Sequence, residues 1–465
     1  MRFNTRKLIL AVASSVIILI VVVSLIYPAG LSGTGPGTAL SNQAVPGSLA
    51  PSSNAAPSPP DVKASAFKGQ GRLAFVCQGL LYVLDGQTGE VRQLTDAGRA
   101  SQPAWSHDGE WLAFMRFTGP QTPPAIWLVR RDGTQVHHVQ APTAFDRQFS
   151  WSPTDDLLDV SGQNGVWLVP VTGEPRQLSD VPGLVAPDGK TLAYITTLSY
   201  DRNHPEHRND VLYTVAVDGG RPRPRPEWTR RLAALRDNGI ILVGWWPDGK
   251  GLLYWLDPDY SASAMADGVD LYSLRLGDTE PRLLTSGLGR PGWLSMFSRS
   301  SLLMVKGRLR IVWADKSRAM INVESVSIRD LQNPAGCVAI DPSLSADGTR
   351  IAFVAARDLG DNVWGFNKTE DLTAWVATRA LWVENADGSG ARPLASAGQG
   401  VYQPLWSKDG NRILYVKDNF LWLIGAGGGE PEKICGPLAY EDPIAGAFGY
   451  YGFISYQDEV AWFQP

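Results

Sequence analysis

A short turn sequence recurs along this chain and constrains its fold more than any other feature. It reads Trp-Ser-x-Asp-Gly or a degraded form of it, and an apolar segment follows each copy. The recognisable copies begin at Trp105, Trp151, Ala186, Trp246, Leu344 and Trp406, and a weaker copy begins at Met296. Self-similarity at a period of about 40–50 residues is the signature of repeat architectures such as solenoids and propellers.

A second element follows each turn at a variable distance and resembles Leu-Trp-Leu-Val. Its copies span 81–84, 126–129, 166–169, 212–215, 271–274, 381–384 and 421–424, with a looser version at 310–313. A turn with Asp-Gly or Gly-Gly and a short strand, such as 92–95, completes the unit. Each unit therefore predicts four strands.

The residue types fit a four-stranded antiparallel blade. In Pro-Asp-Gly, proline fixes φ, aspartate caps its own turn and glycine tolerates a positive φ, as a tight hairpin requires. The strand that follows, such as 111–115, is a nearly continuous apolar run, which is typical of strands covered on both faces. Aromatic residues at equivalent positions would fill the space between neighbouring blades. The sequence thus predicts an all-β fold, a β-propeller of four-stranded blades.

These repeats resemble the TolB-type, WD40-like propeller family with PD40 repeats, from about residue 70 to the C-terminus. The resemblance implies an architecture and not an activity, because the motifs are structural. Counting the units gives eight blades, with seven as the alternative, in a propeller that spans 67–465. We expect the segments 451–456 and 460–463 to complete the first blade and close the ring.

The N-terminus predicts a membrane anchor. Residues 1–7 carry three basic side chains, and no charged residue lies between Leu8 and Tyr27. An apolar run of about 20 residues can cross the ~30 Å hydrocarbon core of a bilayer. Because the basic residues precede the run, the positive-inside rule places 1–7 in the cytoplasm and the rest outside. We expect a single-pass protein of the cell membrane, anchored by 8–27, with an extracellular or periplasmic C-terminal domain; a cleaved signal peptide is the alternative.

The segment 28–66 joins this anchor to the repeats. It is rich in glycine, proline, serine and alanine and carries little charge. Such a segment cannot bury enough apolar surface to fold, so we expect a disordered stalk.

Charge and cysteine content exclude further classes. A net charge of −4 gives no long-range field that would attract nucleic acid, so we expect no nucleic-acid partner. The three cysteines, Cys77, Cys337 and Cys435, form neither a disulfide framework nor a metal-binding spacing. We expect buried thiols, and one disulfide is possible in an oxidising compartment.

Connection lengths separate the two faces of the expected propeller. The tight turns, which join strands one and two and strands three and four, lie on one face, which we call the turn face. The connections between strands two and three, and between blades, lie on the other, which we call the long-loop face. Its long segments are 198–210, 257–269 and 357–379, and the inter-blade stretch 219–237. Long loops on a rigid scaffold are where binding usually occurs.

Aromatic and arginine side chains are enriched at binding hot spots, and the long segments carry both. The candidate binding residues are Tyr200, Tyr260, Trp364, Phe366, Trp375, Arg221, Arg223, Arg225, Arg230 and Arg231. Two structural alternatives stay open. The aromatic side chains of 357–379 could form a small core of their own, and the arginine run could be a solvated connector. The expected partner is a protein, an envelope polymer or a small ligand.

The sequence predicts no catalytic residue, metal ligand or cofactor. The segment 204–207 resembles a histidine metal pair, but Pro205 predicts an irregular loop there. We expect His137 and His138 to be structural residues of an outer strand, and His107 to replace proline in a turn. No Gly-x-Ser-x-Gly elbow or phosphate-binding loop is present.

The function that these features favour is an extracytoplasmic binding scaffold. The alternative is a propeller enzyme, glycosidase- or lyase-like, with an active site of dispersed residues at the mouth of the channel. Two carboxylates gathered at that mouth would favour the enzyme. A sensor subunit is a third hypothesis, and it would need a membrane partner because residues 1–7 carry no signalling domain.

Overall fold

The chain divides into two units, residues 1–59 and 60–465. The computed structural model describes residues 59–118, 124–139, 148–152, 155–162, 165–180, 182–201, 204–217, 223–224, 238–258, 269–275, 277–278, 280–288, 302–305, 308–313, 318–322, 324–325, 327–359, 369–438 and 456–465. The predicted anchor and most of the predicted stalk lie outside these residues. None of the helices that are described is long and apolar enough to cross a bilayer.

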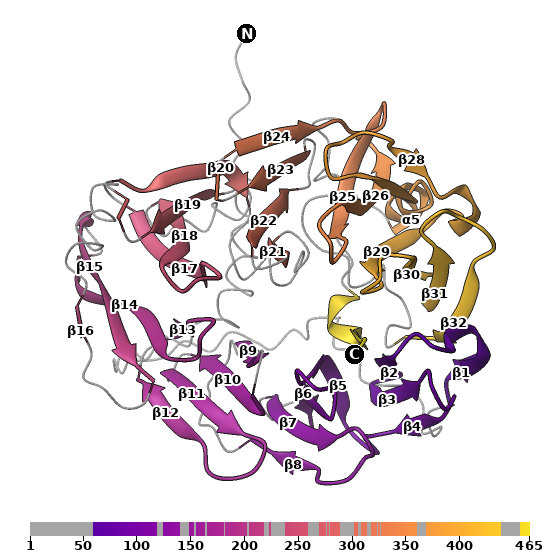
Figure 1. Ribbon diagram of the computed structural model, residues 1–465, viewed down its shortest axis with the longest axis horizontal. Coiled ribbons are helices and arrows are strands. Elements are labelled where there is room, and N and C mark those ends of the chain that lie inside the picture. Colours follow the sequence, from indigo (N-terminus) through magenta and orange to yellow (C-terminus); the bar gives the residue numbers. More distant parts are fainter. Residues whose placement is uncertain are drawn as a thin grey trace, which may run out of the picture. The chain divides into compact units, whose positions relative to one another are not determined.

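Within 60–465 the described strands form eight antiparallel sheets, which follow one another in chain order around a common axis (Figure 1). Sheet 1 contains β33 (Val460–Phe463), β2 (Arg72–Cys77), β3 (Leu80–Asp85) and β4 (Val91–Gln93). Sheet 2 contains β5 (Arg99–Trp105), β6 (Trp111–Phe117), β7 (Ala125–Arg130) and β8 (His137–His138). Sheet 3 contains β9 (Gln148–Trp151), β10 (Leu157–Gly162), β11 (Gly165–Pro170) and β12 (Arg176–Ser179). Sheet 4 contains β13 (Gly183–Val185), β14 (Thr191–Asp201), β15 (His204–Ala216) and β16 (Arg223–Pro224).

The second half of the unit repeats this order. Sheet 5 contains β17 (Asn238–Trp245), β18 (Gly251–Pro258), β19 (Val269–Arg275) and β20 (Arg282–Leu288). Sheet 6 contains β21 (Leu302–Val305), β22 (Arg308–Trp313), β23 (Arg318–Asn322) and β24 (Ser327–Leu331). Sheet 7 contains β25 (Cys337–Leu344), β26 (Arg350–Arg357), β27 (Ala380–Asn385) and β28 (Arg392–Pro393). Sheet 8 contains β29 (Val401–Trp406), β30 (Arg412–Lys417), β31 (Phe420–Gly425), β32 (Glu432–Gly436) and β1 (Asp61–Val62). The described helices are η1 (Ala64–Phe67), α5 (Thr369–Val376), η3 (Ala395–Ala397) and η4 (Gln457–Glu459).

The apolar core lies between neighbouring sheets and not within one. In β2, Leu73 and Phe75 belong to a buried cluster shared with sheet 8. The alternating residues Ala74 and Val76 belong to a second cluster shared with sheet 2. Because successive side chains of a strand point to opposite faces, a strand covered on both faces must be apolar throughout. The continuous apolar runs of the sequence therefore follow from packing between sheets.

The tryptophan that ends the innermost strand bonds to the preceding sheet. At four interfaces its indole Nε1 donates to a main-chain oxygen of the innermost strand of that sheet. The donor and acceptor pairs are Trp105 and Ala461 (3.1 Å), Trp151 and Ala104 (2.9 Å), Trp245 and Leu184 (2.8 Å), and Trp406 and Ser343 (3.0 Å). The repeated tryptophan thus both fills and hydrogen-bonds each of these interfaces.

The recurring turn has the structure that its residues predict. Asp108 Oδ1 accepts hydrogen bonds from Ser106 Oγ (2.6 Å) and from the Glu110 amide (2.9 Å). Gly109 adopts a φ of 69°, which an L-residue with a side chain rarely adopts. The turns at Asp347 and Asp409 repeat the serine-to-aspartate bond at 2.6 Å.

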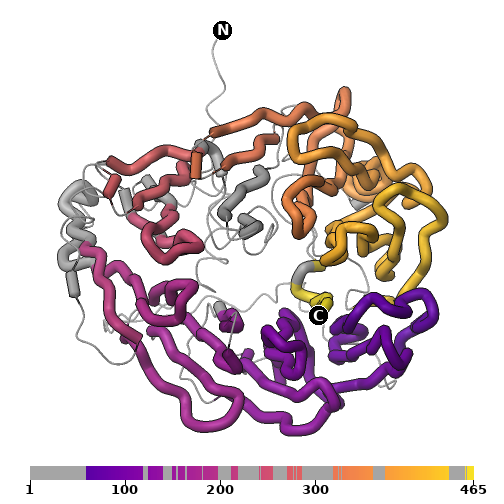
Figure 2. Tube along the Cα trace, viewed as in Figure 1, coloured from indigo at the N-terminus to yellow at the C-terminus, as the bar shows by residue number. Residues whose placement is uncertain are grey.

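Both ends of the described chain take part in closing the arrangement (Figure 2). Strand β33 pairs with β2 and places Phe463 opposite Arg72, so the prediction that 460–463 completes the first blade is confirmed. Strand β1 pairs with β32 and adds a fifth strand to sheet 8. The folded unit thus includes β1 and η1, both of which begin before residue 67, the predicted start of the propeller. Segment 451–455 lies outside the described residues.

One sequence interpretation is wrong. The segment 204–207 is not an irregular loop, because β15 begins at His204 and pairs with β14 as far as Asp201. Most of the expected loop 198–210 is therefore an extended hairpin of sheet 4. The histidines of β8 have the expected structural position, since His137 and His138 pack against the rings of Trp111 and Trp127.

The indole bond between sheets makes a testable contribution to stability. We expect Trp406→Phe to lower the free energy of unfolding by about 1–3 kcal/mol, because the buried main-chain oxygen of Ser343 loses its donor. Trp167→Phe is the control, since the buried Nε1 of Trp167 has no partner among the described residues. Urea denaturation of both variants is the measurement. Equal losses in the two variants would show that the hydrogen bond contributes nothing.

Candidate functional site on the long-loop face

The innermost strands of sheets 2, 7 and 8 start at the long-loop face and end at the turn face. Each ends at the residue that precedes a turn serine, so its first residues lie at the opposite end. Helix α5 belongs to the connection between β26 and β27 and therefore lies on the long-loop face; Figure 1 shows it beside sheets 7 and 8, and it shares an apolar cluster with Val338 of β25 and Tyr402 of β29. The described part of this face thus combines strand starts with one structured insertion.

Helix α5 is fixed by three apolar side chains on one of its faces. Leu372, Trp375 and Val376 are buried in the core cluster that joins sheets 7, 8 and 1. Their spacing of three and four residues is that of an amphipathic helix. Trp375 is fully buried, and its indole Nε1 donates to the main-chain oxygen of Arg357 at 2.8 Å. Trp375 therefore holds α5, and with it the connection between β26 and β27, against the core.

Arg379 follows α5 and is itself buried, with 1% of its surface exposed. Its guanidinium carbon lies 4.7 Å from the ring centroid of Trp375 and 4.6 Å from that of Tyr402. Burial lowers the pKa of Arg379, whereas Tyr402, Asp341 and Tyr456 act in the opposite direction. A buried charge is costly unless other groups stabilise it, and here two aromatic rings stack on the guanidinium.

Four polar residues stand three positions before one pairing position of consecutive innermost strands; three lie within their strand, and Glu459 ends η4 just before β33. In each of these four innermost strands, one residue pairs with the second residue of the neighbouring strand. These residues, which are therefore equivalent in register, are Trp105, Leu344, Trp406 and Trp462. Three residues before each of them stands an amide or an acid. We call these residues the inner polar arc: Asp341 of sheet 7, Gln403 of sheet 8, Glu459 of sheet 1 and Gln102 of sheet 2.

The backbone of the inner polar arc is strained. Gln102, Asp341 and Gln403 have φ values of 53°, 50° and 46°, and each lies at a shift of strand register. A positive φ at a residue with a side chain costs on the order of 1–2 kcal/mol. Such strain clusters at functional sites, because the surrounding structure must retain it.

The inner polar arc also holds buried oxygen atoms that lack partners. The main-chain N–H of Gln403 donates to Asp341 Oδ2 at 3.1 Å, which links sheets 7 and 8. Within the described residues, no group donates to Asp341 Oδ1, Gln403 Oε1 or either carboxyl oxygen of Glu459. Buried polar atoms are nearly always satisfied, so these four oxygens mark an unusual place in the fold.

Burial dominates the electrostatics of the two acids. It raises the pKa of Asp341, although the Arg379 charge and the Gln403 amide oppose the shift. It raises the pKa of Glu459 to about 8, with Arg99 opposing and Asp458 reinforcing the effect. Both groups thus hold protons more tightly than exposed carboxylates do.

The structure describes few of the sequence-predicted binding residues. Trp375 is buried, but in the cluster that joins sheets 7, 8 and 1 and not in a separate core of 357–379. Tyr200 lies in β14 and Arg223 in β16, and only their backbone positions are described. The remaining candidates, Tyr260, Trp364, Phe366, Arg221, Arg225, Arg230 and Arg231, lie outside the described residues.

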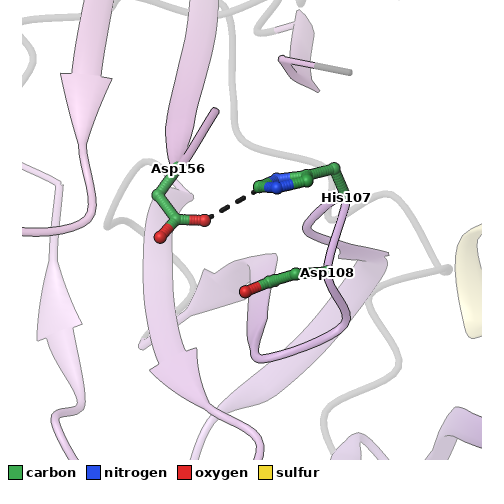
Figure 3. Close-up of side chains that lie close together, drawn as sticks. All are labelled: His107, Asp108 and Asp156. Atoms are coloured by element: carbon green, nitrogen blue, oxygen red, sulfur yellow. Dashed lines mark ion pairs between the residues drawn. The ribbon is translucent and has the colours of Figure 1, made fainter. Parts of the chain in front are cut away.

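One group on the turn face has a metal-like composition. His107, Asp108 and Asp156 bring their ligand atoms within 4.8 Å of one another, and His107 Nδ1 lies 3.7 Å from Asp156 Oδ1 (Figure 3). All three side chains are exposed. Asp108 is already held by the turn hydrogen bonds that recur at Asp347 and Asp409, so its position needs no metal.

Sequence reasoning missed the inner polar arc, although a signal for part of it exists. Gln102, Asp341 and Gln403 each precede a proline, and each stands at the same distance before a turn serine. An alignment of the repeats on that serine would have identified them. Glu459 has no turn motif after it, so only the strand register of β33 reveals its equivalence.

Four-stranded antiparallel sheets that follow one another around an axis, with the first strand innermost, define a β-propeller. The chain is similar to solved structures over most of its length. Dipeptidyl peptidase 4 from Porphyromonas gingivalis matches 81% of this chain and 62% of its own, with 10% identity and a TM-score of 0.50. TolB from Acinetobacter baumannii matches 79% of this chain and 64% of its own, with 14% identity and a TM-score of 0.33.

A prolyl endopeptidase matches 81% of this chain and 49% of its own, with 13% identity and a TM-score of 0.44. The chain thus spans about half to just under two thirds of these three proteins. No known protein family and no curated protein matches the sequence. The comparisons therefore support the fold alone.

Trp375 gives a direct test of how α5 is held. We expect Trp375→Ala to lower the free energy of unfolding by about 3–5 kcal/mol, since it leaves a large cavity. Amide hydrogen exchange of Thr369–Val376 should also become faster. Trp422→Ala, in the half-buried position of β31, is the control and should leave exchange in α5 unchanged. If α5 kept its protection from exchange in Trp375→Ala, the conclusion that Trp375 holds α5 in place would be wrong.

Proposed function

We propose that this chain is a membrane-anchored, extracytoplasmic β-propeller that binds a protein, an envelope polymer or a small ligand through its long-loop face. The observation that supports this proposal is the contrast between the faces. The described turns of the turn face are tight copies of one another, whereas the long-loop face carries α5 and the longest connections. Variation on a constant scaffold is where recognition develops.

We further propose that each of the eight sheets is one blade and that the repeats belong to the TolB-type, WD40-like group. The turn sequences and the packing between consecutive sheets support this proposal. An experimental structure that resolves the segment around 289–301, between sheets 5 and 6, would test the blade number.

The binding face can be tested with two blocks of substitutions. One block is Trp364→Ala with Phe366→Ala, and the other replaces Arg221, Arg223, Arg225, Arg230 and Arg231 by Ser. We expect each block to reduce crosslinking of the full chain to its partner in intact cells at least tenfold, because hot-spot residues contribute about 2 kcal/mol or more each. Quantitative mass spectrometry of crosslinked products is the measurement.

A matched change on the opposite face controls this experiment. Lys408→Ala with His107→Ala alters exposed residues of two turns and should leave the crosslinked products unchanged. Loss of partners in this control and not in the two blocks would place recognition on the turn face and contradict the proposal.

The proposed anchor has its own test. We expect the full chain to stay in the membrane fraction after alkaline carbonate extraction, and a chain that lacks 1–27 to be released. A mature N-terminus near residue 28, found by mass spectrometry, would establish the cleaved signal peptide. If carbonate released a full chain that still carries residues 1–27, the proposed anchor would be wrong.

A second candidate function is the propeller enzyme. The observation that favours it is the presence of two buried carboxylic residues, Asp341 and Glu459, each three residues before the same pairing position of an innermost strand. Their burial argues for a structural use. Saccharide cleavage by the purified propeller that is lost in Asp341→Asn would establish the enzyme.

A further inference from the structure

The inner polar arc contains buried oxygen atoms without a donor at the junction where the ring closes. Asp341 Oδ2 already accepts a hydrogen bond from the main-chain N–H of Gln403, so the two residues are neighbours across sheets 7 and 8. Asp341 Oδ1 and Gln403 Oε1 are then both buried acceptors without a donor in the described structure. Glu459 has two such oxygens and no exposed surface. A carboxyl group buried without donors for its oxygens is stabilised most directly by a proton, which removes its charge.

The charged groups around each acid do not replace that proton. Asp341 faces Arg379, which is stacked between Trp375 and Tyr402 and interacts with Tyr402 and Tyr456 as well.

Glu459 faces Arg99 of β5 and its own neighbour Asp458. Arg99 is exposed, whereas Glu459 is fully buried. A screened positive charge offsets little of the cost of burying a carboxylate.

We propose that Asp341 and Glu459 are two proton-binding sites that hold the closing junction of the propeller together in their neutral, protonated form. In this form Asp341 is uncharged and keeps the contact of its Oδ2 with the Gln403 main-chain N–H, and the docked η4 and β33 enclose an uncharged Glu459. The proton comes from solvent and returns to it when the acid ionises. Closure of the ring between sheets 7, 8, 1 and 2 is therefore sensitive to pH.

The direction of this sensitivity follows from linkage. The pKa of Glu459 rises from 4.5 to about 8 on folding. Its contribution to stability is therefore complete below pH 4.5, falls as the pH rises, and is lost above about pH 8. Between these limits the ratio of folded to unfolded protein decreases by up to about tenfold per pH unit. Asp341 acts in the same direction.

Infrared spectroscopy of the folded propeller at pH 6 tests the protonation itself. We expect a carbonyl band of a buried carboxylic acid that shifts on deuteration, loses part of its intensity in Glu459→Gln, and loses a further part in Asp341→Asn. Absence of the band in the wild-type protein would overturn the proposal without the need for any variant.

Thermal unfolding between pH 5 and 9 tests the consequence. Wild type should lose stability as the pH rises, whereas Glu459→Gln, an isostere of the neutral acid, should show a shallower dependence. The protection of β33 amides, measured relative to their intrinsic exchange rate at each pH, should fall above pH 8 in wild type only. A Glu459→Gln profile parallel to that of wild type would overturn the role of Glu459 in closure.

Asp347→Asn is the matched control. Hydrogen bonds from Ser345 and Thr349 lower the pKa of Asp347 to about 2, so its contribution is present above its ordinary pKa and is lost only as the pH falls toward 2. This variant should keep the wild-type slope between pH 5 and 9. A flattened slope in Asp347→Asn would show that the slope reports general destabilisation and would also overturn the proposal.

Discussion

The structure depends on the contact between one sheet and the next, and the repeated tryptophan is its most informative part. A sheet of this protein has no core of its own, so each must bury both faces against its neighbours. The indole of Trp151 or Trp406 fills that interface and also donates to a main-chain oxygen of the preceding innermost strand. Orientation between sheets is therefore fixed by a directional bond as well as by apolar burial, which has no direction.

The two faces of the propeller differ because different interactions determine their structures. The turn face is determined by local chemistry, in which serine, aspartate and glycine satisfy one another within five residues. The long-loop face is free of that requirement and carries α5, with the buried Arg379 directly after it, whereas the inner polar arc lies about midway along the innermost strands. The strained backbone of Gln102, Asp341 and Gln403 is retained there because the interfaces between the sheets hold it in place.

Local signals predicted the fold well and the candidate site poorly. The turn at Asp108 and the strand at 460–463 could be recognised because their residue types specify them directly. The hairpin of β14 and β15 was mistaken in part for a loop, because polar residues beyond the sheet interface carry no apolar periodicity. Glu459 could not be recognised at all, since its equivalence to Asp341 exists only through the pairing of two strands that are distant in sequence.

The two chain ends enter neighbouring sheets by unequal means. β33 is an innermost strand held by four residue pairs, the indoles around it and a shared apolar core, whereas β1 pairs at only Asp61 and Val62 along the outer edge of sheet 8. A pulling force applied through the chain before residue 60 would act on β1 first. This strand would peel away before β33 is loaded, so tension on a tethered N-terminus would be relieved at the rim and the ring would stay intact.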